Sequence, residues 1–111
     1  MYATKFSDSG YEVDTADSSA AVISLLEQGN IYDLSLLDIV MPGTSGLELL
    51  KLINENFPNQ ISHHIFLTNQ GQERDIKEAK AVGAVGYIIK SETIPSEVVA
   101  EVGRIIDELK Q

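Results

Sequence analysis

One stretch decides the fold of this chain: Asp33-Leu34-Ser35-Leu36-Leu37-Asp38-Ile39-Val40-Met41-Pro42-Gly43-Thr44-Ser45-Gly46-Leu47. Residues 34–37 form a short and mostly apolar run, which is typical of a strand buried on both faces of a parallel sheet. After the turn at Met41-Pro42-Gly43, Thr44 or Ser45 can cap a helix that ends at Pro58. A buried strand, a carboxylate, a turn and a helix make one unit of an α/β domain.

The same alternation continues along nearly the whole chain. Further strands are predicted at residues 11–16, 65–68 and 86–90. Further helices are predicted after Asp17-Ser18-Ser19 up to Gly29, from about Ile76 to Gly83, and from Pro95 to Leu109, with Pro95 suited to a first helical turn. Short strands that alternate with helices predict an α/β domain whose parallel sheet is covered by helices on both faces.

Composition limits the class of protein. The chain has 111 residues, enough for one small domain, and 43% of them are apolar. Its 17 acidic residues outnumber 8 Lys and Arg, which gives a net charge of -9. Nucleic-acid backbones and anionic membranes bind clustered positive charge, so neither is expected as the main partner. The chain has no cysteine, which excludes a disulfide framework and a thiolate metal site.

Targeting and enzymatic patterns are missing from the sequence. No signal peptide is recognisable at the start, and no run approaches the roughly 18 apolar residues of a membrane span, so we expect a cytoplasmic protein. There is no Gly-rich phosphate loop and no placeable Ser-His-acid arrangement, so we do not expect an enzyme. His63 and His64 adjoin a strand, where neighbours point to opposite faces, and a surface role is expected rather than a shared metal ion.

Chemistry is expected where the strands end, because ligands of parallel sheets bind at the carboxyl ends of the strands. Asp17, Asp38, Thr68 and Lys90 all follow or end a predicted strand. Two carboxylates, a hydroxyl and an ammonium suit a phosphorylatable aspartate. The carboxylate would be the nucleophile, and the lysine and hydroxyl would bind phosphoryl oxygens as charge develops on them.

These motifs resemble the receiver domain of two-component response regulators, a CheY-like family. The resemblance rests on the stretch from Asp33 to Leu47, on Phe66-Leu67-Thr68, and on Gly83-Ala84-Val85-Gly86-Tyr87-Ile88-Ile89-Lys90, at spacings that fit the family. The segment from Gly10 to Asp17 resembles the family's second strand and the turn after it. The resemblance covers almost the whole chain and implies a flavodoxin-like fold.

The resemblance also implies a role for individual residues. Asp38 is expected to accept a phosphoryl group from a histidine kinase or phosphotransfer protein. Thr68 would bind a phosphoryl oxygen, Lys90 would pair with the phosphorylated aspartate, and Tyr87 would swing inward as a switch. Asp38 and the backbone carbonyl of Val40 would be ligands of Mg²⁺. The family's partner surface comprises the helix after Thr68, the strand with Tyr87 and the last helix.

The start of the chain departs from this family. An apolar first strand that ends in an acidic, Mg²⁺-binding pair is missing, and residues 1–9 supply only about the last two turns of the first helix, with Tyr2 and Phe6 spaced i, i+4. Residues 1–111 are therefore expected to be a truncated receiver with four strands in the order 2-3-4-5. Mg²⁺ binding would be weakened or lost.

Three explanations of the missing strand are open: a truncation, closure of strand 11–16 directly against the next strand, or a second copy that fills the gap by self-association. Closure would bring Asp17 toward Asp38 as a substitute metal ligand. The rival function is a non-phosphorylated pseudo-receiver that acts by protein-protein contact.

Two smaller departures lie near the expected site. Lys90-Ser91 replaces a usual Lys-Pro with a cis bond, and a cis bond before Ser costs about 3 kcal/mol. Either the fold holds that strain or the lysine sits differently. Asn69 follows Thr68 in place of a small residue, and we expect it to restrict access to Asp38 or to tune the lifetime of the phosphate.

Overall fold

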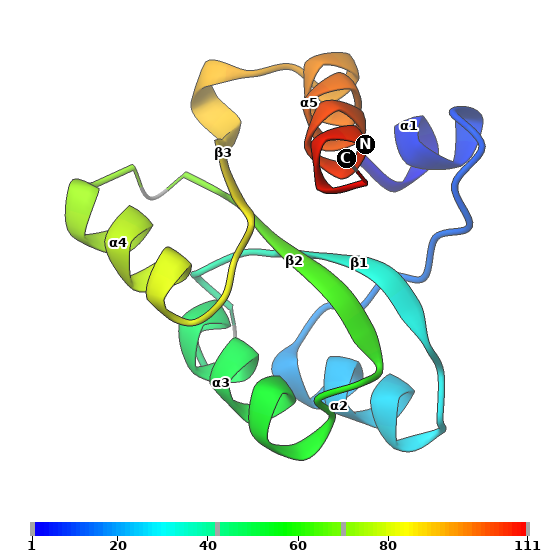
Figure 1. Cartoon of the computed structure of the whole chain (residues 1–111), viewed down its shortest axis with the longest axis vertical. Coiled ribbons are helices and arrows are strands. Elements are labelled where there is room, and N and C mark those ends of the chain that lie inside the picture. The colour runs from blue at the N-terminus through cyan, green and yellow to red at the C-terminus, as the bar shows by residue number, and fades with distance from the viewer. Residues whose placement is uncertain (1, 42, 70, 111) are drawn as a thin grey trace.

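A computed structural model describes residues 2–41, 43–69 and 71–110 (Figure 1). Its elements are α1 (Tyr2–Asp8), α2 (Ser19–Glu27), β1 (Tyr32–Leu37), α3 (Gly46–Asn56), β2 (Ile61–Thr68), α4 (Glu73–Ala81), β3 (Gly86–Ile89), the 3-10 helix η1 (Lys90–Glu92) and α5 (Pro95–Leu109). Pro42, which the sequence places in the turn after Asp38, lies outside the described residues. The predicted alternation of helices and strands is confirmed in all but one segment.

The sheet has three parallel strands in the order β1-β2-β3. Leu37 of β1 lies opposite Phe66 of β2, and Phe66 lies opposite Tyr87 of β3. Helices α2, α3 and α4 cover one face of this sheet, while α1 and α5 cover the other (Figure 1). The flavodoxin-like class with helices on both faces is therefore confirmed.

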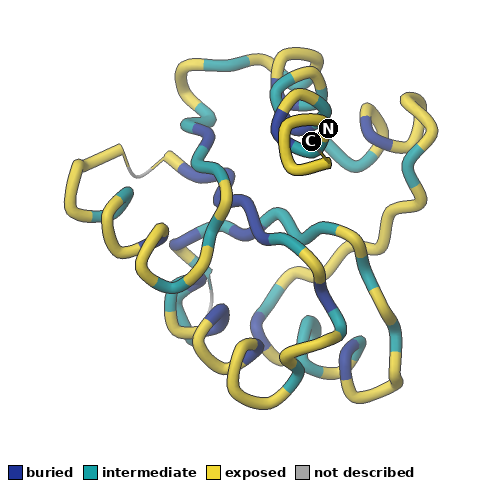
Figure 2. The backbone as a smooth tube through the Cα atoms, viewed as in Figure 1, coloured by how far each residue is buried: buried dark blue, intermediate teal, exposed yellow. Residues whose placement is uncertain are grey.

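Alternation along β2 divides the core into two layers. Phe66 points to the α2-α3-α4 side, where it packs among Leu49, Leu50 and Ile53 of α3. Ile65 and Leu67 point to the other side, toward the apolar stripe of α5. The stripe and its partners in this second layer are Phe6, Ile88, Val98, Val102 and Ile105. Most of the central strand is buried, as the dark blue of Figure 2 shows.

The predicted strand at residues 11–16 is wrong. This segment forms no strand, and residues 12–17 are all exposed. Tyr11 packs against Phe6 of α1, with ring centroids 5.3 Å apart, and the hydroxyl of Tyr32 donates a hydrogen bond to Asp14 at 2.7 Å. The residues of this segment favour a strand, but no neighbouring strand pairs with them in the described sheet. Strand propensity alone does not form a ladder.

Helix ends follow the predicted caps where the structure describes them. The Ser18 hydroxyl accepts from the backbone N–H of Ala21, and the Ser45 hydroxyl accepts from that of Glu48. Pro95 occupies the first turn of α5, as expected. Among the described residues, none of the helices combines the length and the apolar character that crossing a bilayer requires.

Candidate phosphoacceptor site

Three side chains meet at the carboxyl edge of the sheet. Asp38 follows the last residue of β1, Thr68 is the last residue of β2, and Lys90 follows the last residue of β3. Parallel strands bring their carboxyl ends to one edge, so residues far apart in the sequence become neighbours. The structure thus brings together three of the four residues that were expected at this edge from the sequence, namely Asp38, Thr68 and Lys90.

Asp38 is held on both carboxylate oxygens. The Thr68 hydroxyl donates to Oδ1 at 2.7 Å, and the backbone N–H of Val40 donates to the same oxygen at 3.1 Å. The Lys90 ammonium donates to Oδ2 at 2.8 Å. A carboxylate fixed by an ammonium and a hydroxyl is a preorganised nucleophile beside two groups that can bind anionic oxygens.

The surroundings keep Asp38 ionised. Partial burial by itself would raise its pKa, but the hydrogen bonds from Lys90 and Thr68 outweigh that effect and hold the pKa below its usual value. The Asp38 and Lys90 side chains keep 29% and 31% of their exposed surface, so the pair remains open to solvent from one side. An incoming group can therefore reach the carboxylate.

Two hydrogen bonds hold described backbone atoms between Asp38 and α3 in place. The Gly46 N–H donates to the carbonyl of Ile39 at 2.9 Å, and the Ser19 hydroxyl of α2 donates to the carbonyl of Thr44 at 2.9 Å. A Cβ on residue 46 would collide with the Asp38 carbonyl group. Glycine at this position thus allows α3 to begin directly against the phosphoacceptor strand.

Comparison with known families agrees with this geometry. A family model described as "Response regulator receiver domain" matches residues 1–102. The chain belongs to the response regulator receiver family. The receiver is 35% identical over 101 residues to "Transcriptional regulatory protein ResD" of Bacillus subtilis, and 32% identical over 111 residues to "Response regulator SaeR" of Staphylococcus aureus. These matches cover 91% and 97% of this chain but 40% and 45% of the relatives, so the chain spans less than half of their length.

Solved receivers share the fold. A chemotaxis response regulator of Vibrio cholerae, CheY4, superposes with a TM-score of 0.82 at 27% identity, over 95% of this chain and 86% of that one. A two-component response regulator from Clostridium difficile superposes with a TM-score of 0.84 over 99% and 87% of the two chains. At 22% identity the second likeness speaks for the fold alone. Receivers of this kind are generally non-enzymatic signalling modules.

Receivers generally bind Mg²⁺ for phosphorylation, but the residues described in this receiver do not form such a site by themselves. Within the described ranges, no group of three or more His, Cys, Asp or Glu side chains could hold a metal ion. The two oxygens of Asp38 are engaged by Lys90, Thr68 and the N–H of Val40. Oxygen ligands of a hard cation must come from carboxylates, carbonyls or water, and Asp38 with the Val40 carbonyl is too small a set.

Asp17 was predicted to approach Asp38 if strand 11–16 closed against the next strand. That closure does not occur, because residues 11–16 form no strand and Asp17 is exposed in the segment before α2. The structure therefore does not support Asp17 as a substitute metal ligand beside Asp38.

Lys90 reaches Asp38 without a cis peptide bond. None of the described residues has a cis peptide, so the strained alternative at Lys90-Ser91 is not adopted. Lys90 instead opens η1, and the Thr93 hydroxyl donates to the carbonyl of Ile89 at 3.1 Å. Asn69, next to Thr68, is exposed at the edge of the site.

Tyr87 lies beside the site on β3. It is half-buried, and its ring contacts that of Phe66 with centroids 6.3 Å apart. Burial raises the pKa of Tyr87, and the negative charges of Asp75 and Asp38 raise it further. The predicted switch residue is thus within the electrostatic influence of the phosphoacceptor.

The surface role predicted for the adjacent histidines is wrong for His64. Its side chain is buried on β2, and its Nδ1 is 2.6 Å from the hydroxyl of Ser35, its register partner on β1. Burial lowers the pKa of His64 to about 4, and the nearby His63 adds to this effect. No pattern in the sequence predicts this polar contact, because alternation does not say which face of the sheet an isolated histidine takes.

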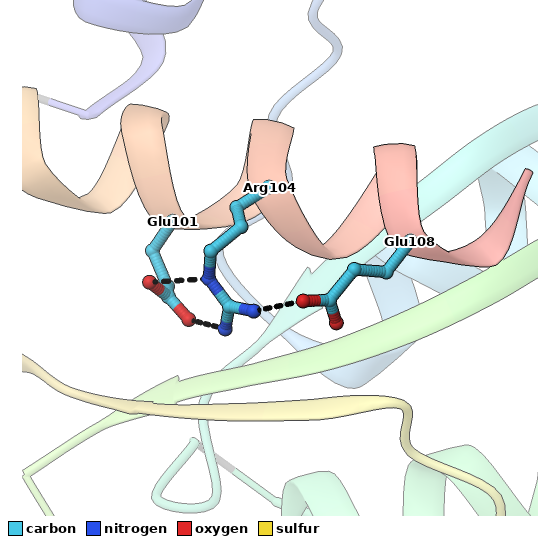
Figure 3. A network of polar contacts seen from close by, with 3 residues as sticks. All are labelled: Glu101, Arg104 and Glu108. Atoms are coloured by element: carbon cyan, nitrogen blue, oxygen red, sulfur yellow. Dashed lines mark hydrogen bonds and ion pairs between the residues drawn. The ribbon is translucent and has the colours of Figure 1, made fainter. Parts of the chain in front are cut away.

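A second polar network lies on the exposed side of α5 (Figure 3). Arg104 binds Glu101 one turn before it and Glu108 one turn after it. This network borders a surface groove of about 390 Å³ between α4, β3 and α5, which Ile76, Lys80 and Tyr87 also line. The groove lies on the surface that the resemblance assigned to partners.

Proposed function

We propose that this receiver accepts a phosphoryl group on Asp38 from a histidine kinase or a phosphotransfer protein. The observation that carries the proposal is the convergence of Thr68 and Lys90 on one carboxylate, at 2.7 Å and 2.8 Å. An oxygen of Asp38 would form a bond to phosphorus while the phosphorus–nitrogen bond of the donor histidine breaks, and the electron pair would remain on that nitrogen.

The neighbours of Asp38 would stabilise the product. The Lys90 ammonium would stay paired with the negatively charged phosphorylated side chain. The Thr68 hydroxyl would turn from Oδ1 to donate to a phosphoryl oxygen. Exposed Asn69 would border the entering group and tune the lifetime of the phosphate. Binding of Mg²⁺ would be weak, because the described residues supply too few oxygen ligands.

The net charge of -9 supports proteins, rather than nucleic acids or anionic membranes, as the direct partners. The groove between α4, β3 and α5 is the surface where a partner would sense the state of Tyr87. Its border carries both signs of charge, with Lys80 on α4 and the Glu101-Arg104-Glu108 network on α5.

Acetyl phosphate supplies the test of phosphoryl transfer. The purified chain is incubated with acetyl phosphate, with and without Mg²⁺, and its intact mass is compared with that of an Asp38→Asn control. A phosphoryl adduct on the wild type alone supports the proposal, and its dependence on Mg²⁺ measures the metal requirement. A folded sample that gains no adduct in either condition overturns it.

One observation favours a second candidate, a pseudo-receiver that acts by self-association. Within the described sheet, β1 pairs only with β2, so its other edge presents unpaired N–H and C=O groups. Unpaired strand edges are templates for another chain. Sedimentation at increasing protein concentration tests this: a reversible dimer supports self-association, and a constant monomer mass excludes it.

A further inference from the structure

Asp75 carries a buried oxygen that the phosphoacceptor site does not use. Asp75 lies in the first turn of α4, and its side chain is half-buried. Its Oδ2 is shielded from water and accepts no hydrogen bond. Buried polar atoms nearly always have a partner, and a carboxylate oxygen without one is costly. We therefore expect the Asp75 Oδ2 to accept a hydrogen bond from a nearby donor in another conformation of the protein.

Tyr87 is a phenol on which both Asp75 and the phosphoacceptor Asp38 act electrostatically. Tyr87 lies opposite Phe66 on β2, and Phe66 shares its face of the sheet with Thr68, which donates to Asp38. α4, which carries Asp75, packs against β3, which carries Tyr87. Of the two carboxylates that act on this phenol, Asp75 has the larger effect on its pKa and Asp38 the smaller.

We propose that Asp75 is a positioning residue for Tyr87: its Oδ2 accepts a hydrogen bond from the Tyr87 hydroxyl when the ring turns toward α4. The competing ring position directs the hydroxyl toward Thr68 and Asp38. A phenol has one proton to donate, so the two positions exclude each other.

This arrangement couples the site to the partner surface. A change of charge at Asp38 alters the balance between the two ring positions, and the occupied position decides whether Asp75 has a donor. Asp75 precedes Ile76 in the first turns of α4, and Ile76 and Tyr87 both line the groove between α4, β3 and α5. The inference deepens the proposed function, since it names the residue through which α4 senses Tyr87.

NMR of the unphosphorylated chain tests the proposal directly. Three-bond couplings from the backbone N and C′ to the ring Cγ give the χ1 populations of Tyr87. Asp75→Ala removes the acceptor, whereas Asp75→Asn keeps an uncharged acceptor. Glu73→Ala removes a charge from the same helical turn at an exposed residue whose only described ion pair is with Lys77, at 3.7 Å.

The expected result is a loss of one Tyr87 rotamer in Asp75→Ala, while Asp75→Asn and Glu73→Ala keep the wild-type populations. Unchanged populations in Asp75→Ala, or equal changes in Asp75→Ala and Glu73→Ala, would overturn the proposal. Amide spectra show that each variant is folded. Because no phosphorylation is needed, a failure of acetyl phosphate labelling leaves this result distinguishable from the failure of the proposed function.

Discussion

Gly46 lies against the main chain of Asp38, with no space between them for a side chain. The contact joins the first residue of α3 to the residue that follows β1, and the Gly46 N–H bond to Ile39 fixes the turn between them. The position of the Asp38 backbone therefore requires that residue 46 has no Cβ atom.

Gly46→Ala should lower the free energy of unfolding by about 2 kcal/mol or more, because the new methyl group meets backbone that cannot move aside. Urea unfolding followed by circular dichroism measures this. Gly103→Ala is the matched control: position 103 lies inside α5, and a Cβ there would meet only the Tyr11 hydroxyl at 3.9 Å. It should stabilise the protein by roughly 0.5–1 kcal/mol. Equal effects of the two substitutions would contradict the steric argument.

Lys90→Met should raise the pKa of Asp38. Partial burial already favours the neutral acid, and the substitution removes the ammonium that opposes this effect. Carbon-13 NMR titration of the Asp38 carboxyl group measures the change. The exposed Lys77, whose described partner is Glu73, offers the control: Lys77→Met should leave the Asp38 titration as it is. A similar shift in both variants would show that general charge, rather than the 2.8 Å contact, sets the pKa.

The same pair predicts a dependence of stability on pH. The folded pKa of Asp38 lies below its usual value of 3.8, so the stabilisation that it provides is present above pH 3.8 and is lost as the pH falls through the folded pKa. In Lys90→Met this contribution should be smaller. Urea midpoints across the acidic range, compared between Lys90→Met and Lys77→Met, measure the difference, and parallel curves for the two variants would refute it.

His64 predicts a second loss of stability in acid. Its pKa is lowered from 6.5 to about 4 by burial, so the unfolded chain binds the proton more readily between these values. Stability should be complete above pH 6.5 and fall by about 3 kcal/mol as the pH approaches 4. The difference between the stability curves of wild type and His64→Gln isolates this effect. His63→Gln should keep most of this loss of stability in acid, because burial lowers the pKa of His64 more than the charge of His63 does. A His64 proton resonance that titrates near 6.5 would disprove the prediction.

The pKa of Tyr32 can be used to test the contact between β1 and the segment before α2. Burial, and then the hydrogen bond and charge of Asp14, raise the pKa of Tyr32 to about 12. Asp14→Asn should lower that pKa, because the charge that disfavours the phenolate is removed. Ultraviolet titration, with Tyr32→Phe to identify the signal, measures the change. Asp17→Asn should have no such effect; an unchanged Tyr32 in Asp14→Asn would mean that the contact does not form in solution.

The site was more predictable from sequence than the sheet was. Asp38, Thr68 and Lys90 each follow or end an apolar strand-like run, and parallel topology requires such positions to meet. Residues 11–16 have the alternation of a strand, but a ladder also needs a neighbour of the right register, which no local pattern contains. His64 and Asp75 could not be anticipated, because their burial depends on how β2 faces α2 and α3 and on how α4 docks on β3.

The one-sided pairing of β1 has a consequence for motion. Amides that β1 directs toward β2 are protected by the ladder, while those on its other edge should exchange with solvent much faster. Asp38 therefore sits at the end of a strand that a ladder holds on one edge only within the described sheet. Brief separation of β1 from β2 would carry the carboxylate away from Thr68 and Lys90 while β3 and α5 stay folded. The lifetime of an acyl phosphate on Asp38 would then depend on the rate of this local opening and not on the much slower global unfolding of the domain.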